Sequence, residues 1–225
     1  MSLPSLPLVG FDIETDTTSG GLDPSASSIV AVAISVNWVA EQPRPPGSAC
    51  VSGTAGPPVV EHVLTGAEAQ IIADTDRILA GLPAGYLVTW NGSTFDLPFV
   101  RHRARELGLR IGLETVDDPA RRFRDEPGRP AVRGRWYDLV HLDGFVLYRA
   151  DVGVNLHLSC GLKPLAKLVG MTPVELDQSQ LHLESDEDIA AYVASDARTA
   201  VALVLRRWPA AQRVADFRLA GVGSP

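Results

Sequence analysis

The chain has little cysteine and little lysine, and it has no long hydrophobic run. Its 225 residues include two cysteines, Cys50 and Cys160, which have no neighbouring cysteine to form a C-x-x-C pair. This spacing excludes a disulfide framework and a cysteine-based metal or redox motif, so a cytoplasmic location is expected. No apolar run approaches the roughly 20 residues of a membrane helix. The amino terminus also lacks the basic region of a signal peptide, so we expect a soluble protein.

Excess positive charge is missing as well. With 20 basic and 27 acidic residues the formal net charge is −7 at pH 7, which argues against a protein that holds nucleic acid through overall positive charge. The charge is uneven, because residues 101–135 contain ten arginines and six acids. This Arg-rich segment could follow a single-strand backbone, or it could be a solvated loop, and both interpretations stay open.

What is present is typical of a folded α/β chain. Hydrophobic residues make up 45% of the sequence and charged residues 21%, which excludes disorder for most of the chain. β-Branched and apolar runs of strand length predict five strands, and the first two of them are expected to pair antiparallel. The predicted strands are residues 8–15, 29–38, 59–64, 86–90 and 136–139.

Segments of helical periodicity separate and follow these strands. Thr65 is a candidate cap for the first helix, and Ser185 forms a capping-box pair with Asp188 at the start of the last one. Residues 41–58, with five prolines, and residues 110–135, without periodicity, are predicted to be loops. The predicted helices are residues 65–81, 96–107, 140–147, 162–169 and 185–208. The pattern predicts a single domain over residues 1–225, with a mixed five-stranded sheet flanked by helices.

The first predicted strand carries two acids on one face. Asp12 and Glu14 are two residues apart, so their side chains project to the same side, and Gly10 leaves room for another group to approach that side. Each uncompensated carboxylate in a buried strand costs several kcal/mol to desolvate, so such a pair indicates a bound cation. The alternative is a strand end at which both acids meet solvent.

Two later motifs add further acids. Asp96 lies in the segment NGSTFDLPF, where a loop enters a helix, and it is either a helix cap or a functional carboxylate. Tyr192 and Asp196 are four residues apart on the last predicted helix, so the phenol and the carboxylate emerge on one face. Taken alone, this pair could equally be a surface hydrogen bond. The information lies in the combination of the three motifs.

In this order, a strand D-x-E, an N-x-x-x-F-D-x-P junction and a helical Y-x-x-x-D resemble the DEDD (DnaQ-like) superfamily of 3′-to-5′ exonucleases, in its tyrosine subtype (DEDDy). The subtype with histidine would need that residue at position 191, which is alanine here. The middle motif is most similar to the exonuclease domain of family B DNA polymerases and its stand-alone bacterial relatives. The resemblance implies a ribonuclease H-like fold and removal of nucleoside 5′-monophosphates from single-stranded 3′ ends of DNA or RNA.

The resemblance also assigns roles to individual residues. It makes Asp12, Glu14, Asp96 and Asp196 the metal-binding acids, and it gives Tyr192 the task of orienting the attacking water. Two divalent ions held in this way activate water and neutralise the leaving oxygen. Hard oxygen ligands favour Mg²⁺ or Mn²⁺ over Zn²⁺. The five histidines show no zinc-binding spacing, which agrees with this expectation.

A second group of residues is implicated in substrate binding. By the same resemblance Thr15, Asn91 and Phe95 hold the 3′-terminal nucleotide, although Phe95 could instead belong to the core. Lys163, in LKPLAKLVG, is a candidate phosphate contact. Candidate aromatic side chains for base stacking are Trp90, Phe123, Trp136 and Tyr137.

Three interpretations of function remain at this stage. The exonuclease is favoured because all four acids and the tyrosine are present. A non-catalytic nucleic-acid-binding or partner-docking module of the same fold would be expected to have lost at least one acid. An endonuclease of the same broad fold is the third. The expected partners are single-stranded nucleic-acid ends and, in trans, a polymerase or helicase. The motifs do not fix contacts to the 2′ position, which distinguish RNA from DNA.

Overall fold

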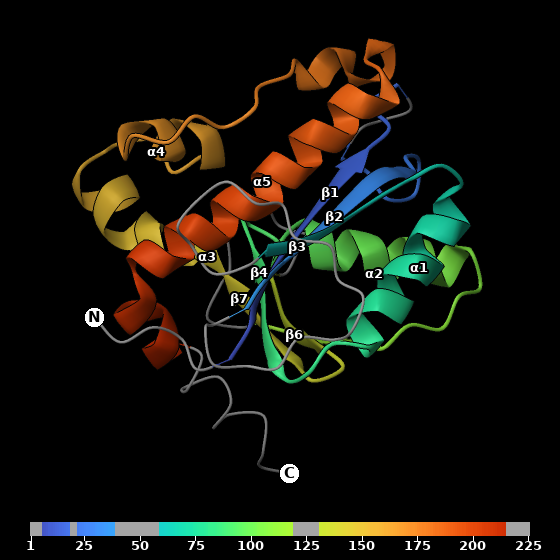
Figure 1. Cartoon of the computed structure of the whole chain (residues 1–225), viewed down its shortest axis with the longest axis horizontal. Coiled ribbons are helices and arrows are strands. Elements are labelled where there is room, and N and C mark those ends of the chain that lie inside the picture. Colours follow the sequence, from blue (N-terminus) through green and yellow to red (C-terminus); the bar gives the residue numbers. More distant parts are fainter. Residues whose placement is uncertain (1–5, 19–21, 39–58, 119–130, 215–225) are drawn as a thin grey trace.

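The computed structural model describes residues 6–18, 22–38, 59–118 and 131–214, so the predicted loop at 41–58 lies outside the described residues. A seven-stranded mixed sheet lies between two groups of helices (Figure 1). This arrangement confirms the predicted α/β class with helices flanking a mixed sheet. None of the helices in the described ranges combines the length and apolar composition that a bilayer crossing requires.

The sheet combines an antiparallel and a parallel part. Strand β1 pairs antiparallel with β2, as predicted, and β2 pairs antiparallel with β3. Strands β1, β4 and β7 run parallel, and the antiparallel strands β6 and β5 complete the order β3-β2-β1-β4-β7-β6-β5. The strands are β1 (Leu8–Thr15), β2 (Ile29–Asn37), β3 (Val59–Thr65), β4 (Gly85–Thr89), β5 (Leu113–Asp117), β6 (Val132–Trp136) and β7 (Leu139–Asp143).

The prediction of five strands was too low. Strands β5 and β6 occupy part of the segment predicted to be a loop. The predicted strand at 136–139 spans the end of β6, the turn at 137–138 and the start of β7. Within that turn Tyr137 has a positive φ of 52°. Strands β5 and β6 carry charged residues and a glycine, so they lack hydrophobic alternation. Their pairing is held by backbone hydrogen bonds and by an ion pair between Arg135 and Glu114 at 2.8 Å.

The helices begin and end close to the predicted positions, with two corrections. Thr65 does not cap the first helix: it ends β3, and the cap position is Ala67. The predicted helix at 140–147 is also wrong in its first half, because residues 139–143 form β7. Ser185 is confirmed as the cap of the last helix. The helical elements are α1 (Glu68–Ala80), α2 (Asp96–Glu106), α3 (Gly144–Tyr148), η1 (Arg149–Asn155), α4 (Leu162–Leu168), η2 (Gln178–Leu183) and α5 (Asp186–Arg206).

The two faces of the sheet carry different helices. Val9, Phe11 and Ile13 of β1 belong to the core that contains the apolar residues of α1 and α2. Helices α3, α4 and α5 cover the opposite face (Figure 1). On that face a β-carbon at Gly10 would collide with the carbonyl oxygen of Ala197 in α5. The absence of a side chain at Gly10 therefore lets α5 lie directly on β1.

Candidate active site

Strand β1 places two carboxylates beneath α5. Asp12 and Glu14 follow Gly10 at intervals of two residues, so they face the same side of the sheet. Opposite them in β2 lie Ala33 and Ala31, whose small side chains leave space for the acids and the helix. Asp12 is half-buried and Glu14 is buried. The predicted pair therefore does not simply meet solvent at a strand end.

Helix α5 brings the third carboxylate to this place. Its start is defined by Ser185, whose hydroxyl accepts a hydrogen bond from the backbone N–H of Asp188 at 3.1 Å. Val193, Ala194 and Ala197 of α5 pack against the alanines of β2. This packing orients Asp196 toward β1. One carboxylate oxygen from each of Asp12, Glu14 and Asp196 lies within 4.8 Å of the others.

Asp96 follows the loop after β4, the strand that lies parallel to β1. It is the first residue of α2 and is buried, with 3% of its surface exposed. The cap position of α2 is Phe95, so the interpretation of Asp96 as a helix cap is wrong. Its carboxylate accepts a hydrogen bond from the backbone of Ile13, the residue between the two acids of β1. Asp96 therefore lies beside the three clustered carboxylates, although it is not one of that set.

A buried aspartate that the sequence reasoning missed holds the loop before Asp96. Asp143, at the end of β7, accepts hydrogen bonds from the backbone N–H of Asn91 at 2.9 Å and of Ser93 at 3.3 Å. The hydroxyl of Ser93 donates to the same carboxylate at 2.5 Å. Asp143 also caps α3 by accepting from the N–H of Phe145 at 3.1 Å. One carboxylate thus ties the loop at 91–95 to the neighbouring parallel strand.

A signal for Asp143 was present in the sequence. The segment LVHLD ends an apolar run with an acid, and the carboxyl ends of parallel strands meet at one edge of a sheet. The prediction failed because residues 140–147 were assigned to a helix rather than to a strand. Without β7 as a neighbour of β4, nothing placed Asp143 near Asn91.

The clustered acids share raised pKa values. Burial is the largest cause for each of them, followed for Asp12 by the negative charges of Asp96, Glu14 and Asp196. The pKa of Glu14 rises to about 8, that of Asp96 to about 7 and that of Asp196 to about 6. The protein alone therefore holds these groups partly protonated near neutral pH, and a cation would reverse the shifts.

One cation of the chain already lies at the cluster. The Nζ of Lys163, in α4, is 3.2 Å from Oδ2 of Asp196 and 3.2 Å from the ring centroid of Tyr192. Its positive charge lowers the pKa values of Asp12, Glu14 and Asp196, against the effect of burial. Tyr192 is buried one turn before Asp196. The predicted site residues of α4 and α5 are therefore in contact with each other.

The donor set fits a divalent metal ion. Asp12, Glu14 and Asp196 supply hard carboxylate oxygens, and Mg²⁺ and Mn²⁺ prefer such ligands. Oδ1 of Asp196 is buried and has no hydrogen-bond partner within the described part of the chain. A buried acceptor without a partner costs free energy. An ion at this oxygen would remove that cost, so these three acids could hold a metal, with Asp96 beside them.

The other residues predicted to bind substrate come from the end of β1 and from the loop before α2. Thr15 is buried directly after Glu14, where the register between β1 and β2 shifts. Asn91 has a positive φ of 67°, and its side-chain oxygen accepts from the hydroxyl of Thr94 at 2.8 Å. Phe95 is partly buried against the core and packs on Phe99, with ring centroids 5.3 Å apart. The ring thus belongs to the core edge and still keeps an exposed part.

The candidate stacking aromatics are not equivalent. Trp136 is fully buried and its indole N–H donates to Asp76 at 2.8 Å, so its assignment to base stacking is wrong. Trp90 is partly buried, and its indole N–H donates to the carbonyl of Cys160 at 3.0 Å. Tyr137 is 38% exposed, and its hydroxyl donates to Asp76 at 2.6 Å. Phe123 lies outside the described residues.

Comparisons with known proteins identify a family and a similar fold. The family described as "DNA polymerase family B, exonuclease domain" matches residues 1–155. Over 120 residues, 52% of this chain, the sequence is 31% identical to DNA polymerase epsilon catalytic subunits B and A of Arabidopsis thaliana, and it covers 5% of their length. The fold resembles that of the family B DNA polymerase from the archaeon Pyrobaculum calidifontis, with a TM-score of 0.61, 18% identity, and coverage of 92% of this chain and 25% of that one.

Proposed function

Because the chain belongs to the family of the exonuclease domain of family B DNA polymerases, we propose that it is a metal-dependent 3′-to-5′ exonuclease acting on single-stranded ends. The supporting observation is the meeting of Asp12, Glu14 and Asp196 from β1 and α5. Asp196 and Tyr192 lie beyond the residues matched by the family, so their place beside β1 supports the proposal independently.

The acids have a direct task in this proposal. Asp12, Glu14 and Asp196 would hold divalent ions, with Asp96 as a further ligand. Two such ions lower the pKa of a water molecule and neutralise charge on the scissile phosphate and the leaving 3′ oxygen. The raised pKa values favour this role, because carboxylates that repel one another gain most from a bound cation. Mg²⁺ or Mn²⁺ is the proposed ion.

The remaining residues would position the reactants. We assign to the Tyr192 hydroxyl the orientation of the attacking water, and to Lys163 a contact with the phosphate. Thr15, Asn91 and Phe95 would hold the terminal nucleotide. Cleavage of the last phosphodiester bond then gives a nucleoside 5′-monophosphate and a new 3′ hydroxyl. A polymerase in trans is a proposed partner, since the relatives are DNA polymerase subunits.

The direct test is degradation of a 5′-labelled single-stranded oligonucleotide with Mg²⁺ or Mn²⁺. The expected result is a ladder that shortens from the 3′ end, with nucleoside 5′-monophosphates as products and no reaction in EDTA. A circular single strand should stay intact, and its cleavage would show an endonuclease instead. Full-length substrate at high enzyme concentration, on DNA and RNA alike, would reject catalysis and favour the non-catalytic module.

A further inference from the structure

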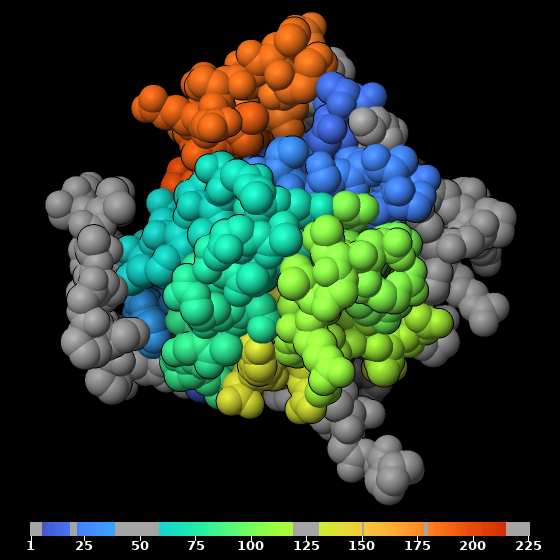
Figure 2. All heavy atoms as spheres, turned by 90° about the vertical axis from the view of Figure 1, so that its right-hand side faces the viewer, coloured from blue at the N-terminus to red at the C-terminus, as the bar shows by residue number. Residues whose placement is uncertain are grey.

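A groove of about 360 Å³ opens next to the loop that carries Asp96. One wall is the outer face of α2, the other is the segment between β1 and β2, and the start of β6 closes the end. Figure 2 shows the β1–β2 segment, in blue, lying against α2, in light green. The lining residues from α2 and its preceding loop are Thr94, Phe95, Pro98, Phe99, Arg101, His102 and Arg105; the others are Leu22, Pro24 and Val132.

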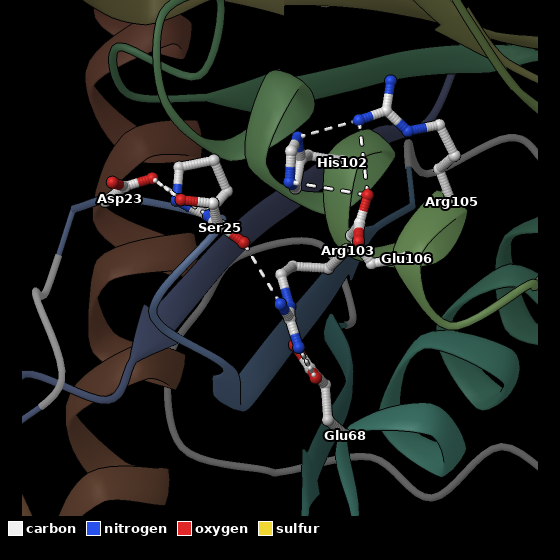
Figure 3. A network of polar contacts seen from close by, with 8 residues as sticks. Asp23, Ser25, Glu68, His102, Arg103, Arg105 and Glu106 are labelled. Atoms are coloured by element: carbon white, nitrogen blue, oxygen red, sulfur yellow. Dashed lines mark hydrogen bonds and ion pairs between the residues drawn. The ribbon is translucent and has the colours of Figure 1, made fainter.

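The groove is fixed by Arg103, whose side chain lies on the other side of α2 from Arg105 (Figure 3). Its guanidinium donates to both carboxylate oxygens of Glu68, at 2.8 and 2.6 Å, and to the carbonyl of Pro24 at 3.1 Å. Arg103 is thereby neutralised, and it ties the β1–β2 wall to α2. The groove therefore has a fixed width between two walls of the fold.

The charge of the groove is positive on its α2 side. Arg101 is exposed and donates to the hydroxyl of Thr115, which is a neutral partner. The guanidinium of Arg105 is 72% exposed and lies 3.4 Å from the carboxylate of Glu106 and 3.4 Å from Nδ1 of His102. These are long, solvent-exposed contacts of little energy. Two arginines thus face one exposed acid, which suits an anionic ligand.

The apolar part of the groove suits flat rings. Phe95, which is partly buried, lies at its floor on the buried Phe99, and Leu22 on the opposite wall is 62% exposed. A surface that combines aromatic groups with arginines is typical of sites for single-stranded nucleic acid, because bases stack and phosphates pair with the cations. Neither part alone would distinguish a nucleotide from another ligand.

The arginines of the groove lie along α2 at increasing distance from Asp96. Asp96 is the first residue of the helix, and at ~1.5 Å per residue Arg101 and Arg105 lie roughly 7 and 14 Å along it. With stacked nucleotides ~3.4 Å apart, this distance corresponds to about two to four nucleotides. We propose that this groove binds the nucleotides upstream of the 3′-terminal one, and that it makes the enzyme prefer oligonucleotides over dinucleotides. The inference rests on the proposed nuclease function.

The test compares Arg101→Gln/Arg105→Gln with a control, Arg77→Gln/Arg213→Gln, which removes two exposed arginines from outside the groove. Binding of a 5′-fluorescein single-stranded decanucleotide is followed by anisotropy in EDTA at several salt concentrations. Each phosphate contact on a single strand contributes ~0.7 to the salt slope. The groove variant should bind about tenfold or more weakly, with a salt slope lower by ~1.4, while the control binds like the wild type.

The rate of cleavage separates the groove from the catalytic cluster. The groove variant should lose kcat/KM on the decanucleotide by about tenfold and keep the wild-type rate on a dinucleotide, because a dinucleotide does not reach Arg101. Leu22→Asp, at an exposed position, should reduce decanucleotide binding in the same direction. Unchanged affinity, or equal losses on both substrates, would overturn the proposal. A wild-type protein that binds the decanucleotide through these arginines but never cleaves it would reject only the nuclease function.

Discussion

The carboxylates of the site fall into a sheet half, which consists of Asp12, Glu14 and Asp96, and a helical half, which consists of Asp196 on α5. The two halves are held in place by different interactions. Asp12 and Glu14 lie in the central part of the sheet, and Asp96 follows a loop that Asp143 holds by hydrogen bonds. Asp196, by contrast, is positioned by the packing of α5 on Gly10 and the alanines of β2. The first half also lies within the residues that the family matches, and the second half lies beyond them.

The two halves also differ in how their negative charge is compensated. The sheet half brings three acids together, and burial followed by the negative charges around them raises their pKa values. The helical half adds one acid together with Lys163, which compensates part of the negative charge. We infer that the sheet half sets the geometry of the ligands and that the helical half adjusts how strongly they bind an ion.

The largest expected effect comes from removing a ligand in either half. Asp12→Asn and Asp196→Asn should each reduce the proposed nuclease activity by roughly 10³-fold or more, since each removes a proposed metal ligand worth several kcal/mol. Neither variant should unfold. Without metal, the melting temperature of Asp12→Asn should stay equal or rise because a like charge is removed, whereas that of Asp196→Asn should fall because Lys163 loses its partner. Asp186→Asn, an exposed acid at the start of α5, is the control. A wild-type rate for either variant would contradict the assignment.

A smaller loss of activity is expected when the loop at 91–95 loses its hydrogen bonds to Asp143. Oδ1 of Asp143 accepts from Asn91 and Oδ2 accepts from Ser93. Asp143→Asn turns one of these two acceptors into a donor, which should reduce stability by about 1–3 kcal/mol. Activity should fall by about 10- to 100-fold at a temperature where the protein is fully folded, because Asp96 is no longer positioned. Asp138→Asn, exposed in the preceding turn, serves as the control. If the rate merely followed the folded fraction, Asp143 would have a structural role only.

Substitutions of the two lysines of the chain test whether the charge beside Asp196 affects metal binding. Lys163→Met removes the cation at Asp196, and it should bind Mn²⁺ several-fold more tightly in a calorimetric titration while cleaving more slowly. Lys167→Met changes the next turn of α4, where the Nζ pairs with the exposed Glu175 at 2.6 Å, and it should alter neither quantity. Weaker Mn²⁺ binding by the Lys163 variant would show that the ammonium does not compete with the ion.

The smallest effect concerns pH in the absence of metal. Because burial and mutual repulsion raise the pKa values of Glu14 to about 8, of Asp96 to about 7 and of Asp196 to about 6, the folded state binds more protons than the unfolded state between pH 4 and 8. Stability contributed by these groups is therefore lost as the pH rises through that range. The melting temperature in EDTA should fall by several degrees from pH 5 to 8. Saturating Mn²⁺ should remove this slope, and an unchanged slope would contradict metal binding by these acids.

The sequence predicts some parts of the site better than others. The alternation in β1 and the helical spacing in α5 are local patterns, so Asp12, Glu14, Tyr192 and Asp196 could be placed on their elements. Strands β5 and β6 have no hydrophobic alternation, and their existence depends on pairing with distant residues. The contacts of Asp143 with Asn91 and of Lys163 with Asp196 join segments far apart in the chain, so the local patterns around these residues do not show them.

Because Gly10 has no side chain, α5 packs directly on β1 and Asp196 lies close to Asp12 and Glu14. A β-carbon at this position would meet the Ala197 carbonyl and would lie 2.9 Å from a methyl group of Val201. Substitution by alanine would wedge α5 away from the sheet and lengthen the distance between Asp196 and the acids of β1. Position 10 thus determines how closely α5, and with it Asp196, approaches the acids of β1, although it contributes no carboxylate of its own.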